Sequence, residues 1–177
     1  MASSLELSED LFELSPKAID YIENKGKLLK KALDWISIDE CLRAGWEIFP
    51  FASGFLDRYG GWEIRARHTY FQSVLPECES FSSNLFTWMK IMKQKLFPIG
   101  VGESEEYYLI SEYGSIFEAD ECAQGMLKLG DTIAQGIDSI LWFDTKKPDM
   151  YCGENTTFWN KGADFPPPFL HEKFFKG

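Results

Sequence analysis

The sequence predicts a single domain that combines helices and strands. The chain has 177 residues and 45% hydrophobic content, which is enough for one well-buried core. Apolar residues recur at helical spacing up to residue 60, and strand-like stretches alternate with further helical stretches beyond it. Glycine and proline residues punctuate these stretches where elements should end.

The first predicted helix starts at Ser15-Pro16-Lys17, because proline suits the first helical turn. Ile19 and Ile22 are three residues apart and should form its inner face. Gly26 should end this helix.

Helical spacing then resumes between residues 29 and 36. Ser37 and Glu40 are spaced as a capping box, which predicts that a short helix begins there and ends near Gly45.

The most distinctive element is an aromatic helix that stops at a glycine pair. Phe51, Phe55 and Tyr59 recur every four residues on one face, and Pro50 suits the first turn. The pair at 60–61 can adopt positive φ and end the helix.

A strand should follow this helix from Trp62, with polar residues such as Glu63 on its outer face. A second strand over 69–74 is a candidate partner, and residues 76–80 are typical of a loop.

The second half predicts a helix, a group of strands and a closing helix. Residues 82–95 carry an apolar helical stripe with lysines near its C-terminus. Asp131 is a good cap for the closing helix, whose apolar face runs to Leu141. The expected strands cover 96–99, 107–111, 115–118 and 126–129, with a hairpin loop at 112–114.

Three short blocks follow one another along the chain. They are Trp46–Pro50 leading to Phe55–Gly61; Leu96–Gly100 followed by Tyr108–Ser111 and Tyr113–Phe117; and Leu129–Thr132 entering the last helix. In this order and spacing, the blocks resemble the third subfamily of SUKH superfamily immunity proteins. The likeness is strongest over residues 32–143, so we assign residues 1–145 to a SUKH-like domain.

The resemblance implies an α+β fold with a mixed, mostly antiparallel sheet packed by helices. It also implies a protein that is not an enzyme and needs no cofactor. Such a protein would bind and neutralise a cognate toxin, frequently a nuclease. Fold analogy alone is an associational argument for function, so the residues are considered separately.

The segment 146–177 is rich in proline and aromatic residues. Its prolines and glycines disfavour regular structure, and its aromatic content is too high for plain disorder. We expect an irregular extension that packs on the domain, on a partner or on a second subunit.

Composition excludes several functions. A formal charge of −10 argues against direct nucleic-acid binding, because phosphate contacts require Lys and Arg. His68, His171 and four scattered cysteines show no metal-site or nucleophile motif. Without a visible signal peptide or membrane span, we expect a cytoplasmic protein with reduced thiols.

One stretch is strongly acidic, because no Lys or Arg lies between Lys95 and Lys128. It could be a solvated edge that discourages aggregation, or a surface for a basic partner such as a nuclease toxin. Tyrosines among the acids would be binding anchors, although alternation allows only one of Tyr107 and Tyr108 to be exposed. The predicted partner-binding residues are Glu103, Glu105, Glu106, Tyr108, Glu112, Tyr113, Glu118, Asp120 and Glu121.

Two other functions stay open. One is a scaffold or regulatory interaction module, since relatives in the same superfamily serve signalling assemblies. The other is an enzyme that uses carboxylates such as Glu105 and Glu118, which would require a pocket and perturbed pKa values.

Overall fold

The structure is a computed structural model of the 177-residue chain. It describes residues 7–25, 27–28, 35–66, 69–73, 82–102, 106–119, 125–142 and 149–152. Within these ranges, no helix is long and apolar enough to cross a membrane. The elements in chain order are η1 (Glu9–Phe12), α1 (Pro16–Lys25), β1 (Lys27–Leu28), α2 (Trp35–Arg43), α3 (Pro50–Tyr59), β2 (Trp62–Ala66), β3 (Thr69–Gln72), α4 (Ser82–Met92), β4 (Leu96–Gly102), β5 (Tyr107–Ser111), β6 (Ile116–Ala119), β7 (Gly125–Gly130), α5 (Ile133–Trp142) and β8 (Asp149–Cys152).

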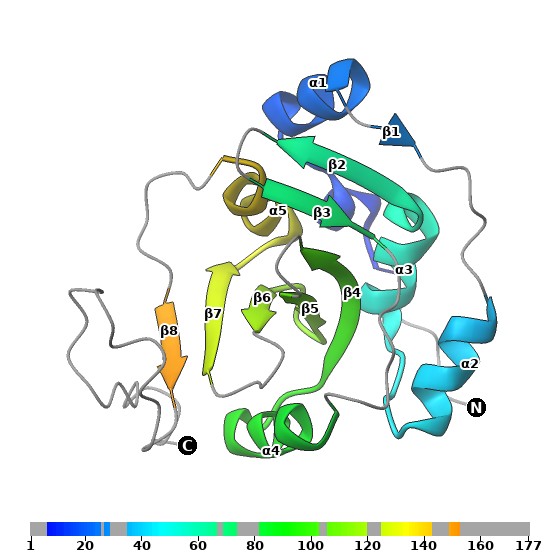
Figure 1. Cartoon of the computed structure of the whole chain (residues 1–177), viewed down its shortest axis with the longest axis vertical. Helices are drawn as coiled ribbons and strands as arrows, with labels where there is room; N and C mark the ends of the chain where they lie inside the picture. Colours follow the sequence, from blue (N-terminus) through cyan, green and yellow to red (C-terminus); the bar gives the residue numbers. More distant parts are fainter. Residues whose placement is uncertain are drawn as a thin grey trace.

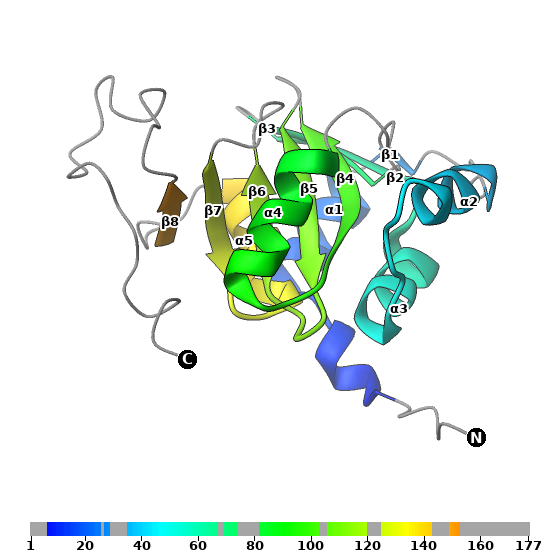
Figure 2. The ribbon, with the colours of Figure 1, turned by 90° about the horizontal axis from the view of Figure 1, so that it is seen from below.

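The strands form one eight-stranded sheet whose spatial order is the order of the sequence. Each described pairing is antiparallel, and Leu109 on β5 lies opposite both Pro98 on β4 and Phe117 on β6. Helices lie on both faces, with α4 on one and α1 and α5 on the other (Figures 1 and 2). The prediction of an α+β fold is therefore confirmed.

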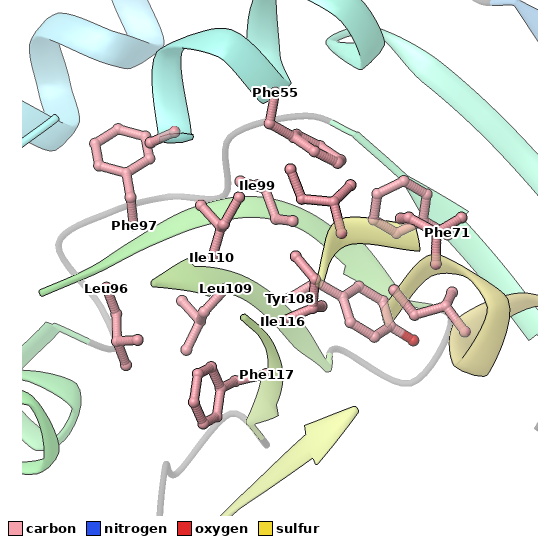
Figure 3. Close-up of a cluster of buried hydrophobic side chains, with 14 of the residues drawn as sticks. Phe55, Phe71, Leu96, Phe97, Ile99, Tyr108, Leu109, Ile110, Ile116 and Phe117 are labelled. Atoms are coloured by element: carbon pink, nitrogen blue, oxygen red, sulfur yellow. The ribbon is translucent and has the colours of Figure 1, made fainter. Parts of the chain in front are cut away.

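The core lies on both sides of the central strands β4 and β5. Leu109 and Phe117 project from one face, whereas Ile99 and Ile110 project from the other (Figure 3). All four are essentially inaccessible to solvent, and burying a side chain of this size stabilises the fold by about 1.5–3 kcal/mol. Continuous burial follows because this part of the sheet is covered on both faces.

Helix α1 is fixed to α5 through Ser15, the residue immediately before the helix. The Ser15 hydroxyl accepts a hydrogen bond from the Ala18 N–H at 3.0 Å, which caps the helix, and donates one to Asp138 Oδ1 at 2.6 Å. Ala18 and Ile22 are buried, but Ile19 is 42% exposed. The predicted inner face is thus correct for Ile22 and wrong for Ile19, because Ala18 rather than Ile19 faces the core.

Helix α2 begins at Trp35, so the predicted capping box is wrong and Ser37 lies inside the helix. The helix ends at Arg43, and Gly45 follows with φ +98°, close to the predicted end. Cys41 is fully buried and forms a disulfide bond whose second cysteine lies outside the described side chains. This differs from the expected reduced thiols, because sequence spacing does not report which cysteines meet in space.

Helix α3 matches its predicted bounds. Pro50 occupies the first turn, and the chain leaves the helix through Gly60 and Gly61. Only Gly61 takes a positive φ, +83°. Phe55 is fully buried with its ring centroid 5.2 Å from that of Tyr59, whose hydroxyl donates to the Phe12 carbonyl oxygen at 2.5 Å.

The edges of the sheet differ from the expectation. β1 pairs with β2 and places Lys27 opposite Glu63, and Glu63 is buried rather than on an exposed outer face. β8 pairs with β7 although residues 149–152 were predicted to be irregular. Both edge strands are short, and each is defined by its neighbour rather than by its own periodicity. The rest of the predicted extension lies outside the described residues.

Candidate functional site

The structure separates the predicted partner-binding residues instead of gathering them. Glu112 and Tyr113 lie in the turn between β5 and β6, whereas Glu106 and Glu118 lie at the other end of those strands. Glu112 lies six residues after Glu106, a separation of about 20 Å along an extended strand. Glu103, Glu105, Asp120 and Glu121 lie outside the described residues.

The turn between β5 and β6 is held by a dense set of hydrogen bonds. The Ser111 Oγ accepts from the N–H groups of Tyr113 at 3.3 Å and Ser115 at 3.1 Å. The Gly114 N–H donates to the Ser111 carbonyl oxygen at 3.0 Å, and Ser111 itself is fully buried. Gly114 has φ +87°, a conformation that favours glycine.

The same turn contacts two other parts of the chain. The Glu112 N–H donates to the Lys95 carbonyl oxygen at 3.0 Å, and the Lys95 N–H returns a bond to Glu112 Oε1 at 2.9 Å. The Lys95 ammonium forms an ion pair with Glu47, which precedes α3. We call Glu47, Lys95, Glu112 and Tyr113 the hairpin tip. Within the tip, Tyr113 is 68% exposed.

At the opposite end, Tyr108 is buried, so the prediction that it is a surface anchor is wrong. Its ring packs against Phe71 with centroids 5.3 Å apart. Gly102 leaves room there, because a Cβ at this position would collide with the Glu106 carboxylate and lie 3.3 Å from the Tyr108 hydroxyl. Glu118 lies directly opposite Tyr108 in the sheet. We call Tyr108, Glu106 and Glu118 the Tyr108 cluster.

Two residues of the Tyr108 cluster, Glu118 and Tyr108, have raised pKa values. Burial, and to a smaller extent the negative charge of Glu106, raise the pKa of Glu118 from its ordinary value of 4.5 to about 7. Burial, and then the charges of Glu118 and Glu106, hold the pKa of Tyr108 well above its usual range. Near neutral pH, Glu118 therefore carries only part of a negative charge.

A carboxyl group with a pKa near 7 has the titration range of a general acid. However, structural groups also show such shifts, and a raised pKa alone does not make a catalytic site. Glu105, the other carboxylate considered for catalysis, lies outside the described residues. Nor do the described side chains include a group of three or more His, Cys, Asp or Glu that could hold a metal ion.

Sequence reasoning did not place Glu47 or Lys95 beside Glu112. The Lys95–Glu47 pair joins residues 48 positions apart, and charge patterning carries no signal at that separation. The exposed Tyr113 was identified, because the Glu112-Tyr113-Gly114 sequence predicts a hairpin turn and a turn residue projects to solvent.

One comparison with known proteins identifies a family. The sequence model of one protein family, described as SUKH-3 immunity protein, matches residues 20–142, which is more than half of the chain. Neither a search of curated proteins nor a search of solved structures returned a match. The matched span runs from α1 into α5 and includes the whole β5–β6 hairpin. The chain therefore belongs to the SUKH-3 immunity protein family.

Proposed function

We propose that this protein binds the toxin domain made by its own cell and neutralises it by covering the toxin's active surface. The observation that carries the proposal is membership of an immunity-protein family over residues 20–142. The mechanism needs no chemistry from this chain, because a tight complex that occludes a substrate groove is sufficient.

The finer proposal is that the toxin is basic, and that it is a nuclease. The chain has a formal charge of −10, and its stretch from Lys95 to Lys128 contains no internal Lys or Arg. A nuclease groove is positive because it must hold phosphates. An acidic surface would speed encounter with such a groove and would exclude nucleic acid from it.

This proposal places the complex in the cytoplasm, where a nuclease would meet its substrate. The disulfide at Cys41 is more typical of oxidising compartments, so the redox state of Cys41 tests this part. Alkylation of free thiols during cell lysis, followed by mass spectrometry, would show whether Cys41 is oxidised in the cell. A disulfide that persists in freshly alkylated lysate would contradict a reducing cytoplasmic location.

The test of the function is co-expression with the product of the neighbouring gene, as the candidate toxin. We expect the two proteins to co-purify as a stoichiometric complex, and the toxin's killing or nuclease activity to fall in proportion to added immunity protein. A scaffold protein would leave that activity unchanged. Toxicity that persists at a molar excess of this protein would refute the proposal.

A further inference from the structure

The hairpin tip has the features of a binding anchor. Tyr113 is 68% exposed, whereas the next most exposed large apolar side chain among the described residues is Leu11 at 46%. Tyrosine is enriched at the centres of protein interfaces, where its ring fills a pocket and its hydroxyl stays hydrogen-bonded. A single exposed apolar residue needs no explanation by itself, so the argument depends on its setting.

That setting is rigid. The turn on both sides of Tyr113 is fixed by hydrogen bonds to the buried Ser111. Glu112 is also bonded in both directions to Lys95 on a separate segment. Behind the turn, the Phe51 ring lies so close that a Cβ on Gly114 would come within 2.8 Å of it. Because the backbone is already ordered, a partner that binds Tyr113 loses little entropy in ordering this loop.

The charges around the tip favour a basic partner. In the Lys95–Glu47 pair the carboxylate side chain is 67% exposed and the lysine 46%. The Lys128–Asp131 pair shows the same asymmetry, with 76% against 21%. Asp131 follows β7, and its carbonyl oxygen accepts from the Ser115 hydroxyl at the base of the turn. Solvent therefore meets carboxylates on both sides of Tyr113, while the cations beside them are already paired.

The other acidic group fits this role less well. Tyr108 is buried and offers no exposed ring, and Glu118 is partly buried with a pKa near 7, so it carries only part of a negative charge near neutral pH. Of the two ends of the β5–β6 hairpin, only the tip combines an exposed aromatic ring with exposed carboxylates among the described residues.

We propose that the hairpin tip is the anchor of the toxin complex, with Tyr113 inserted into an apolar pocket of the toxin and Glu47 facing basic residues at the rim of that pocket. A protein is the fitting occupant, because a protruding ring needs a concave partner and the carboxylates repel nucleic acid. This inference rests on the proposed function, since it locates the surface that performs it.

The test measures binding of purified variants to the toxin domain encoded by the adjacent gene, by calorimetry or biolayer interferometry. We expect Tyr113→Ala to raise Kd by at least about 30-fold, as truncation of an interface hot spot does. Tyr113→Phe should retain most of the affinity, because the ring supplies the buried area. Ile19→Ala is the matched control, since it removes an exposed apolar side chain from α1, which packs on β2 and α5.

A second variant tests the electrostatic part. Glu47→Gln should slow association and flatten its dependence on salt, while changing dissociation little. Thermal unfolding of each variant serves as the folding control, and Tyr113→Ala should leave Tm nearly unchanged because the ring is exposed. If wild type binds and Tyr113→Ala binds within threefold of it, the anchor assignment is wrong and the proposed function stands. If wild type does not bind the toxin at all, the proposed function fails instead.

Discussion

Replacing Glu118 with glutamine should stabilise this protein at alkaline pH and have little effect in acid. Burial and the charge of Glu106 raise the pKa of Glu118 from 4.5 to about 7 in the folded protein. Between these values the folded state binds more protons than the unfolded chain. Stability must therefore fall as pH rises through this window. Below about pH 4.5 the carboxyl is protonated in both states, and no penalty is present.

The size of the effect follows from the same displacement. One pKa unit corresponds to about 1.4 kcal/mol, so a rise from 4.5 to about 7 corresponds to about 3 kcal/mol above neutral pH. Glutamine resembles the protonated carboxyl in shape and never ionises. For a chain of this size, Glu118→Gln should raise Tm by about 6–12 °C at pH 8.5. At pH 4.5 the variant and wild type should unfold together.

Urea unfolding followed by tryptophan fluorescence, repeated from pH 4.5 to 8.5, would measure the difference in free energy directly. Glu23→Gln, which removes an exposed carboxylate from α1, is the control and should show a much smaller dependence on pH. Glu106→Gln should lower the pKa of Glu118 and move the window to lower pH, because the charge of Glu106 contributes to the shift. A constant difference between Glu118→Gln and wild type across this range would refute the reasoning.

Three further outcomes are expected. Gly114→Ala should destabilise the protein by about 1–3 kcal/mol, since φ is +87° and the new Cβ meets Phe51. Gly114→Asn should cost less in chemical unfolding, because asparagine tolerates positive φ and only the contact with Phe51 remains unfavourable. Equal costs for the two variants would contradict this explanation. Ser15→Ala should lower the free energy of unfolding by about 1–2 kcal/mol, because it removes the α1 cap and the bond to Asp138; Ser15→Thr, which keeps the hydroxyl, is the control. Reduction of the Cys41 disulfide should lower the free energy of unfolding by about 2–4 kcal/mol and should lower Tm accordingly. In a Cys41→Ala variant, which lacks this bond, reductant should not lower Tm by this route.

Elements defined by their own residues could be predicted from the sequence. Helix α3 was correct at both ends, because Pro50 fixes the first turn and the glycines that follow Tyr59 release the chain. The β5–β6 hairpin was predicted for a similar reason, since Glu112, Tyr113 and Gly114 mark a turn between two apolar stretches that pair in the structure.

Features that depend on neighbouring parts of the fold could not be predicted from the sequence. Two residues of β1 carry no periodicity, and they become a strand only because β2 offers a free edge. Glu63 has a charged side chain, which predicted an exposed position, but it is buried in the structure. The capping box at Ser37 is a local pattern, but α2 already begins two residues earlier, at Trp35.

The candidate site shows the same division. The sequence predicted Glu112, Tyr113 and Glu118 as parts of one surface. The structure places Glu112 and Tyr113 at one end of the hairpin and Glu118 near the other. The raised pKa of Glu118 depends on which face of β6 it occupies and on the approach of Glu106. Both are properties of the assembled sheet, and a count of charges along the chain does not contain them.

The order of the strands has a consequence for how the protein folds. Each described strand pairs with the strands before and after it in the chain, so the sheet can grow by adding neighbours and no distant segment must arrive first. The connections from β4 to β5, β5 to β6 and β6 to β7 are short, and short loop closures have a small entropic cost, which favours early pairing of these central strands. The β5–β6 hairpin, whose strands are joined by only four residues, is the natural starting point. The turn that presents Tyr113 would then also control how soon a newly made chain is ready to bind.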